Sequence, residues 1–474
     1  MAGRENDGEG DRLGAAEATG AREAADTASS ASAAADTASS IEILTDSTFS
    51  SESEVGVSSV TETSGVTASL PDAAEAERSD EGLGNSPGGK GAALSASTPR
   101  EKGFARLMFW VSLLGLALPL AALALAATVF LSLPRFGALP SGERMRRAEG
   151  SPLYRDGVFL NEIPTSRSAE GTGVLEMLSR ALDPAPRKVP AVPLPTRKSD
   201  LKSLPEGSLV WLGHSSFVLR LAGATVAADP VLGRYASPVK YVNGAFPGTE
   251  IYSAEDFPEI DILLISHDHF DHLDQAAAVA LRERTRAVVC GLGTGAHLER
   301  WGWDPERIRE GLWWDSFRIG GLEVALVPAR HGSNRGVRMD RALWTGFAVS
   351  GGGRKIFYSG DSGYGPHFME AGDRLGPFDL GLLDAGQYDF AWPEIHMTPE
   401  EALTAALDLR LRRYMPVHLG KFAIAVHPWD EPLERAFDGA ARTSAFRLVT
   451  PLIGETVLLD DEQALYRPWW RGIP

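Results

Sequence analysis

The distribution of apolar residues divides the chain into four stretches of different character. Residues 1–103 consist mainly of Ala, Ser, Thr, Glu and Gly, and residues 107–134 contain no charged side chain. Residues 135–205 are rich in proline, and short apolar runs alternating with polar segments recur from Ser208 onward. The pattern predicts a disordered tail, a membrane-spanning helix, a linker and one folded domain.

The tail buries too little apolar surface to offset the entropy of its chain, so residues 1–103 are predicted to be disordered. The hexamer Ala-Asp-Thr-Ala-Ser-Ser occurs in it twice, at 25–30 and at 35–40. Its first hundred residues hold 18 acidic and 6 basic side chains, a net of −12, so −5 of the total −17 remains for the rest. This balance offers no basic surface for nucleic acid, and no nucleic-acid partner is expected.

Residues 104–134 are predicted to form a single-pass membrane anchor. The apolar stretch is long enough to cross a hydrocarbon core of about 30 Å, and Pro119 can kink the helix without preventing insertion. A signal peptide would not carry a leader of about 100 residues. Basic residues flank both ends, so the positive-inside rule leaves open which side of the membrane holds the domain.

Residues 206–474 are predicted to fold as a layered α/β domain, after a linker (135–205) that is either a stalk or an extension along the surface. Apolar runs predict strands, and helical patterns lie between several of them. The predicted strands are 209–212, 217–221, 225–228, 262–265, 287–290, 322–327, 343–349, 355–358, 380–383, 413–417 and 447–449, and the predicted helices are 276–284, 399–409 and 432–442. Thr398 is the predicted N-cap of the second helix, followed by Pro399.

Directly after the strand 262–265 comes the sequence His267-Asp268-His269-Phe270-Asp271-His272, an H-x-H-x-D-H pattern. Imidazole and carboxylate together suit zinc, manganese or iron. Side chains alternate along an extended segment, so His267 and His269 share a face. Asp271 and His272 lie past the turn and can serve a second ion. The single cysteine, Cys290, excludes a disulfide and a cysteine-based metal site, but leaves the compartment undecided.

Three further residues follow predicted strands in the same way. His331 follows 324–327, Asp361 follows 356–358 and His418 follows 414–417. Strand ends on one rim of a sheet bring side chains from distant parts of the sequence to one site. The matching placement predicts that these residues complete the metal centre.

This order of residues resembles the metallo-β-lactamase superfamily of binuclear hydrolases. More narrowly, it is similar to the branch that contains the N-acylphosphatidylethanolamine-hydrolysing phospholipase D and bacterial relatives. The resemblance covers about 208–458 and implies a four-layer αβ/βα sandwich. The blocks that carry it are Trp211-Leu-Gly-His-Ser-Ser, Ala228-Asp-Pro, Asp261–Asp274, Trp313-Trp-Asp, Ser359-Gly-Asp-Ser-Gly-Tyr, Gly376-Pro-Phe-Asp-Leu, Ile395-His-Met-Thr-Pro-Glu-Glu-Ala and Val417–Phe422.

The resemblance implies two divalent metal ions, with Zn²⁺ favoured and Mn²⁺ or Fe²⁺ as alternatives. The residues it assigns to the first ion are His267, His269 and His331. Those it assigns to the second are Asp271, His272 and His418, with Asp361 as a bridge. It gives catalytic roles to Asp271, Asp361 and His396, the last contacting substrate or leaving group. For His214, a structural and a pocket role stay equally open.

The resemblance implies hydrolysis of an ester-type bond, with a phosphodiester of an N-acylphosphatidylethanolamine-like phospholipid favoured. A lactonase and a non-catalytic, membrane-anchored binding protein are the alternatives. Ile395 replaces a glutamine of the phospholipase, and residues 384–392 also differ from it. These departures leave metal binding unaffected and the substrate open. The oligomeric state is not indicated.

Overall fold

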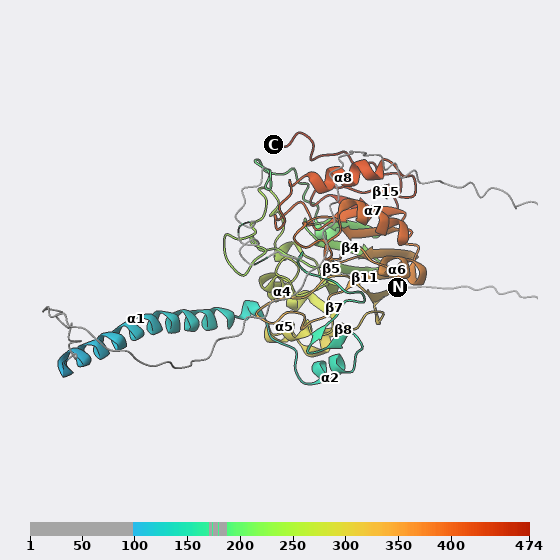
Figure 1. Cartoon of the computed structure of the whole chain (residues 1–474). Helices are drawn as coiled ribbons and strands as arrows, with labels where there is room; N and C mark the ends of the chain where they lie inside the picture. The colour runs from blue at the N-terminus through green and yellow to red at the C-terminus, as the bar shows by residue number, and fades with distance from the viewer. Residues whose placement is uncertain (1–97, 170–172, 174–178, 180–186) are drawn as a thin grey trace, which may run out of the picture. The chain divides into compact units, whose positions relative to one another are not determined.

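The computed structural model describes residues 98–474 apart from 170–172, 174–178 and 180–186 (Figure 1). The predicted disordered tail lies outside the described residues up to residue 97. The described part begins with helix α1 (Pro99–Leu131), whose start is fixed by a capping box between Thr98 and Glu101. None of its residues is buried, and its mean hydropathy reaches 2.3. By length and composition this helix can cross a membrane.

Two mixed sheets of seven strands each form the centre of the domain within the described residues. The first has the order β16-β3-β4-β5-β6-β7-β8 and the second β15-β14-β13-β12-β11-β10-β9. The strands of the first sheet are β3 (Ser208–Trp211), β4 (Phe217–Leu221), β5 (Ala224–Ala228), β6 (Ile260–Ile265), β7 (Thr285–Gly291), β8 (Ile308–Gly311) and β16 (Thr456–Leu458). Those of the second are β9 (Ser316–Ile319), β10 (Leu322–Val327), β11 (Gly346–Gly351), β12 (Arg354–Tyr358), β13 (Leu380–Asp384), β14 (Arg413–Val417) and β15 (Arg447–Leu448).

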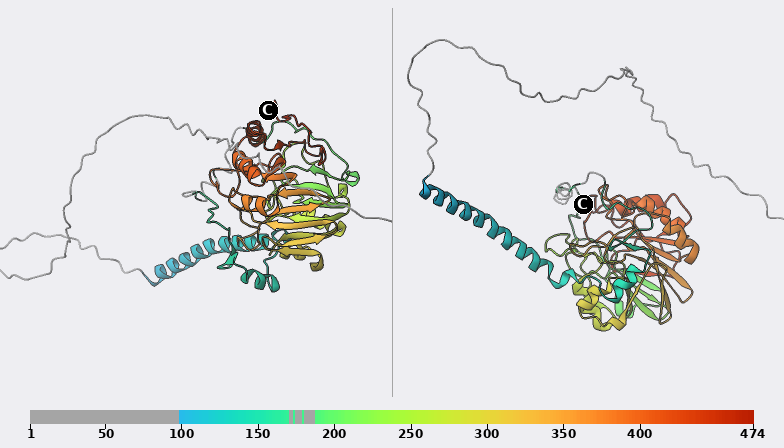
Figure 2. Two further views of the ribbon diagram at one scale, coloured as in Figure 1. Left: turned by 90° about the vertical axis from the view of Figure 1, so that its right-hand side faces the viewer. Right: turned by 60° about the horizontal axis from the view of Figure 1, so that its bottom comes forward.

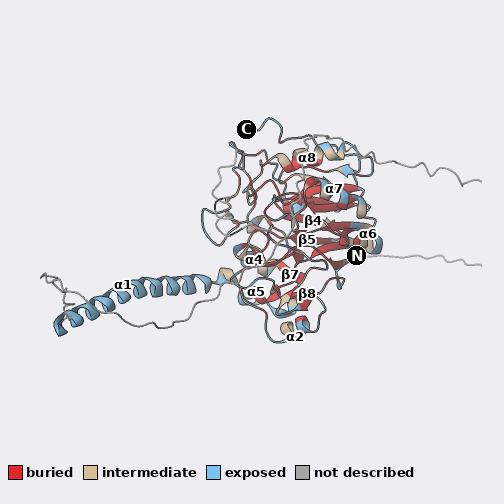
Figure 3. Cartoon of the chain, viewed as in Figure 1, coloured by how far each residue is buried: buried red, intermediate tan, exposed pale blue. Residues whose placement is uncertain are grey.

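The strands read as continuous apolar runs because both of their faces are buried. In β6, Ile262 and Leu264 enter the core between the two sheets, whereas Leu263 and Ile265 enter the core on the outer face. Because side chains alternate along the strand, one apolar run packs into two hydrophobic cores. Figure 3 shows the strands almost wholly buried.

Helices cover the outer faces of both sheets. The first sheet packs against α4 (Gln275–Leu281) and α5 (Gly295–Arg300), the second against α6 (His367–Leu375), α7 (Pro399–Asp408) and α8 (Glu431–Ala440). Figures 1 and 2 show the strands between these two groups of helices. The predicted four-layer αβ/βα sandwich is confirmed.

The residues after α1 run along the surface of the domain, the second of the two predicted arrangements. They form a 3₁₀ turn (Pro134–Phe136), helix α2 (Glu143–Glu149) and the hairpin β1 (Tyr154–Arg155) and β2 (Val158–Phe159). Tyr154 and Phe159 are buried in a small core with Leu343 and Trp344. This segment is therefore part of the folded domain.

The direction of the strands brings the carboxyl ends of several strands from both sheets to the same side of the domain. Strands β12, β13 and β14 are parallel, and β10 runs the same way because β11 is antiparallel to both β10 and β12. In the first sheet β5 and β6 are parallel. The residues that follow these strands are the ones from which the site is built.

Candidate metal centre

The H-x-H-x-D-H segment is a tight turn between β6 and α4. The carbonyl of His269 accepts hydrogen bonds from the amides of His272 and Leu273, at 3.2 and 2.8 Å. The turn ends at Asp274, which caps α4 by accepting from the amide of Ala276. Backbone bonding of this kind brings residues on both sides of the turn to one place.

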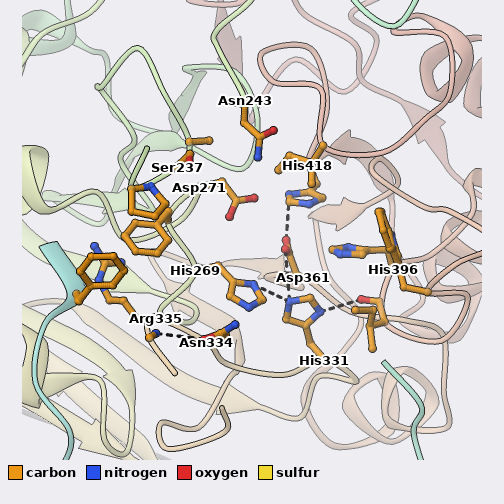
Figure 4. A pocket seen from close by; sticks show the side chains of 18 of the residues that line it. Ser237, Asn243, His269, Asp271, His331, Asn334, Arg335, Asp361, His396 and His418 are labelled. Carbon is orange, nitrogen blue, oxygen red and sulfur yellow. Dashed lines mark hydrogen bonds and ion pairs between the residues drawn. The ribbon is translucent and has the colours of Figure 1, made fainter. Parts of the chain in front are cut away.

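The histidines and aspartates singled out in the sequence lie together in buried groups. One group holds His267, His269, His331 and Asp361. A second group holds Asp271, His272 and His418, together with His214. Within each group the ligand atoms lie within 4.8 Å of one another, a spacing that one metal ion can bridge. Figure 4 shows His269, His331, Asp271 and His418 arranged around Asp361.

Asp361 lies between the two groups. One of its carboxylate oxygens is 3.0 Å from His272 Nε2 and 3.7 Å from His267 Nε2. The other oxygen lies 3.1 Å from His418 Nδ1. The carboxylate therefore contacts histidines of both groups, as a ligand shared by two cations would.

The donor atoms suit a binuclear metal site. His267 Nε2 lies 2.8 Å from His269 Nδ1, and the same His269 atom lies 3.2 Å from His331 Nε2. Three ring nitrogens facing one another need a shared cation or a proton. Among the described residues, His272 Nε2 and Asp361 Oδ1 are buried polar atoms without a hydrogen bond. Such atoms are costly unless a ligand satisfies them.

Burial acts differently on the histidine and aspartate side chains of the two groups. Burial lowers the pKa of His267, His331 and His418 well below the usual range, so their rings stay neutral. Burial raises the pKa of Asp361 to about 7, against the pull of His272. Burial also opposes ionisation of Asp271, but His272 and His214 outweigh it and hold its pKa below the usual range.

His418 is held by a short backbone pairing with His214. The amide of His418 donates to the carbonyl of His214 at 3.1 Å, and the amide of His214 donates to Leu419 at 2.9 Å. Both histidines have positive φ, 63° for His418 and 55° for His214, a backbone conformation that residues other than glycine rarely adopt. The His214 ring places Nε2 3.0 Å from Asp271, which fixes that carboxylate.

His396 lies beside the metal-ligand groups on the loop before α7. Its Nδ1 is 2.8 Å from the carboxylate of Asp384, the last residue of β13. Its ring stacks on that of His418, with centroids 5.0 Å apart. Because Nδ1 is engaged, Nε2 is the atom left for the cavity, where Figure 4 places the ring.

Two carboxylates at the site were not predicted from the sequence. Asp229 follows β5, and it accepts hydrogen bonds from the amide of Ser266 and from Tyr358, at 2.8 and 2.5 Å. It also lies 2.8 Å from Nδ1 of His272. Asp384 orients His396 as described above. Both follow or end a strand, as Asp361 does, but an isolated aspartate in that place is also common in turns.

The remaining histidines lie outside the metal-ligand groups, as predicted. His297 bonds Asp268, His367 bonds Ser362, and His427 bonds the carbonyl of Pro428. These are ordinary hydrogen-bonded positions.

A cavity of about 500 Å³ opens over the centre. The metal-ligand groups contribute His269, Asp271, His331, Asp361 and His418 to its walls. The segment that differs from the phospholipase contributes Trp392, and Ile395 and His396 follow it. Leu131, the last residue of α1, and Phe136 belong to the apolar part of the lining, together with Phe270 and Val337. The cavity therefore joins the polar centre to an apolar entrance.

Comparison with known proteins places the fold and site in one family. The family model described as "Beta-lactamase superfamily domain" matches residues 225–419. An uncharacterized protein of Mycobacterium tuberculosis is 38% identical over 335 residues, 68% of this chain and 88% of the relative. The chain therefore belongs to the metallo-β-lactamase superfamily, a group of metal-dependent hydrolases.

One more distant relative is named for an activity. N-acyl-phosphatidylethanolamine-hydrolyzing phospholipase D 1 of Caenorhabditis elegans is 30% identical over 227 residues, 45% of this chain and 63% of that protein. Among solved structures, Igni18, a metallo hydrolase of Ignicoccus hospitalis, is 23% identical with a TM-score of 0.41. That match covers 53% of this chain and 97% of Igni18.

Proposed function

We propose that this protein is a membrane-anchored, binuclear phosphodiesterase that cleaves a phospholipid of the N-acylphosphatidylethanolamine type in the manner of a phospholipase D. The observation that carries the proposal is the pairing of two metal-ligand groups with an apolar entrance formed by the end of α1. The C. elegans relative, named for this reaction, supports the choice of substrate. In this proposal α1 is a single-pass anchor.

The two groups support the proposed ligand roles. His267, His269 and His331 would hold one ion, Asp271, His272 and His418 would hold the other, and Asp361 would be shared between them. Zn²⁺ is the proposed metal because imidazole and carboxylate ligands in a compact site suit it. When bound, the ion pair supplies Lewis acidity and lowers the pKa of water at neutral pH.

The protein's own residues then orient the substrate and move charge. His396 Nε2 points into the cavity and donates a hydrogen bond to a phosphoryl or leaving-group oxygen once it carries a proton. Asp384 holds the ring by its Nδ1, which fixes where that bond is made. Burial lowers the pKa of His396, so the ring gives up a proton readily. The apolar entrance excludes water from the acyl chains.

Substrate class is tested with the purified full-length, metal-loaded protein. We expect release of phosphatidic acid and N-acylethanolamine from N-acylphosphatidylethanolamine, with ¹⁸O from labelled water appearing in the phosphatidic acid. Mass spectrometry measures both. A water-soluble phosphodiester and a lactone are assayed in parallel. Absence of turnover with every phosphodiester would overturn the proposal, and turnover of the lactone alone would establish the lactonase instead.

The role of the metals is tested by their content. We expect close to two metal ions per wild-type chain, and less in Asp361→Asn and His269→Ala, measured by inductively coupled plasma mass spectrometry. The matched control His396→Gln should keep its metal while kcat falls by about 10²–10⁴-fold, the range for loss of a proton-transfer group. Fewer than one ion per wild-type chain would favour the non-catalytic binding protein.

A further inference from the structure

The residues that follow α1 are hydrogen-bonded to the domain. Trp301 Nε1 donates to the carbonyl of Pro134 at 2.7 Å, and Arg300 donates to the carbonyl of Ser132 at 3.0 Å. The Phe136 ring packs edge-on against Phe270, which lies within the H-x-H-x-D-H segment, with centroids 5.8 Å apart. The chain that leaves the helix therefore continues directly onto the domain.

Arg135 joins this segment to both loops that border the cavity. Its guanidinium donates to the carbonyl of Pro238 at 2.7 Å, and its own carbonyl accepts from Arg335 Nε at 2.8 Å. We define the rim loops as residues 237–242, which contain Pro238, and residues 336–339, which follow Arg335. Figure 4 shows Ser237 and Arg335, from the two sides of this junction, on the opposite side of the cavity from His396.

The uncharged stretch of α1 extends to the last residue of the helix. The first charged side chain after Arg106 is Arg135, only four residues beyond Leu131. Four residues span at most about 14 Å even when fully extended. If α1 spans a bilayer, the helix leaves the hydrocarbon core at its carboxyl end, and the cavity rim must then lie at the membrane surface.

The composition of the rim loops suits such a surface. Tyr241 is 86% exposed and Val337 78% exposed, and Val239, Val242 and Met339 are also exposed. Each loop carries one exposed basic residue, Lys240 or Arg338, and neither contains an acidic one. In a chain of net charge −17 this local excess of apolar and basic side chains is distinctive. It is the combination that inserts shallowly among anionic lipid headgroups.

We propose that the rim loops dock on the leaflet from which α1 emerges, so that the cavity opens onto the bilayer and a lipid enters it without crossing water. The proposal rests on the proposed function in one respect, because it takes α1 as a membrane span. It adds a second membrane contact, made by the domain itself. The hydrogen bonds of Arg135 set the distance between the end of α1 and the rim loops.

Site-specific fluorescence tests the docking without any measurement of turnover. The full-length protein is placed in nanodiscs of phosphatidylcholine with anionic phosphatidylglycerol. The single native cysteine, Cys290, is buried, so a polarity-sensitive fluorophore attaches to an introduced cysteine. The labelled variants are Tyr241→Cys and Val337→Cys in the rim loops, Leu118→Cys in α1, and Leu465→Cys as an 87% exposed control remote in sequence.

We expect blue-shifted emission at Tyr241→Cys and Val337→Cys, with quenching by lipids spin-labelled near the headgroup. Leu118→Cys should be quenched by lipids labelled deep in the acyl chain, and Leu465→Cys should stay water-like. Rim probes that match Leu465→Cys, while Leu118→Cys reports insertion, would overturn the docking and leave the anchor. Water-like emission at Leu118→Cys would contradict both the membrane anchor and the docking of the rim loops.

Turnover provides a second readout. The double variant Tyr241→Asp with Met339→Asp introduces two negative charges at the rim, outside the lining of the cavity. We expect turnover of lipid in anionic nanodiscs to fall by about tenfold or more, because each charge is repelled by the surface. Turnover of a water-soluble phosphodiester should be unchanged, as should both activities in Leu465→Asp. Equal losses on both substrates would contradict docking.

Discussion

Asp229 joins the ends of β5, β6 and β12 beneath the metal-ligand groups. Because its carboxylate accepts from Nδ1 of His272, it fixes Nδ1 as the protonated nitrogen of the neutral ring, which leaves Nε2 as the atom for a metal. Asp229→Asn would put an amide group against Nδ1 and favour the wrong tautomer. We expect affinity for one metal ion to fall by about 10–100-fold, measured by competition with a chromophoric chelator.

A matched control is available on the same sheet. Asp261 accepts from the amide of Thr225 at 2.9 Å at the opposite end of β6. Asp261→Asn should leave metal affinity unchanged. Equal weakening in both variants would show that Asp229 acts through general stability and not through His272.

Lys421 is a buried lysine whose contribution to the free energy of unfolding depends on pH. Burial lowers its pKa from 10.5 to about 8, and its Nζ donates to the carbonyl of Val231 at 2.8 Å. Between these two pKa values the unfolded chain binds a proton that the folded protein does not. The free energy of unfolding should therefore rise with pH from about 8 to 10.5, and the burial penalty applies in full below pH 8.

Comparison with Lys421→Met isolates this contribution. We expect the wild-type free energy of unfolding to gain up to about 3 kcal/mol relative to the variant across that interval, measured by chemical denaturation at several pH values. A difference between the two proteins that stays constant with pH would contradict the assignment.

At the same scale, the residues that the structure gathers into the metal-ligand groups could be predicted, because they are histidines and aspartates that follow apolar runs. His214 was left undecided because its link to Asp271 is made between residues distant in sequence. Asp229 and Asp384 were missed as functional residues, since an isolated aspartate after a strand is also common in turns. Only the fold places them against His272 and His396.

Among the elements, the start of α7 was predicted in detail and orders the loop that carries His396. Thr398 accepts from the amide of Glu401 at 3.3 Å, and the Glu401 side chain accepts from the amide of Thr398 at 2.8 Å. We expect Thr398→Ala to lower the free energy of unfolding by about 1 kcal/mol. Thr404→Ala, within the same helix, is the control, and both are measured by urea denaturation.

The comparison of Thr398→Ala with Thr404→Ala tests the cap. A loss in Thr398→Ala beyond that of Thr404→Ala supports a cap that stabilises the helix. An equal loss in both would contradict a specific contribution of the Thr398–Glu401 capping box, since alanine has the higher helix propensity.

Strands with two buried faces were predicted from their apolar runs, which are unbroken over Leu380–Leu383 of β13. Strands β8 and β9 were missed because exposed charged residues such as Arg309 and Arg318 interrupt them. Helix α6 was missed although it is amphipathic, since its sequence begins at His367 beside Pro366 without a capping side chain. The contact between the proline-rich segment and the domain depends on tertiary packing that no local pattern encodes.

For the whole molecule, the proposed metal ligands come from both sheets. His267 follows β6 of the first sheet, whereas Asp361 and His418 follow β12 and β14 of the second. Ions bound as proposed would connect the two halves of the sandwich. We expect chelation to lower Tm by about 5–10 °C for an ion present at about a hundredfold its Kd.

Scanning calorimetry with and without chelator measures this change, and added Zn²⁺ should reverse it. Asp361→Asn should show a smaller change on chelation than wild type. A Tm that is indifferent to chelator in the wild-type protein would contradict a structural link through metal.

The division of ligands between the sheets has a consequence for biosynthesis. A nascent chain that has left the ribosome only as far as β8 holds the complete H-x-H-x-D-H segment, but not His331, Asp361 or His418. The site can close only after the second sheet has been made and has docked on the first. Metal is then acquired after synthesis of the domain, from the ion pool of the compartment in which the domain completes its folding.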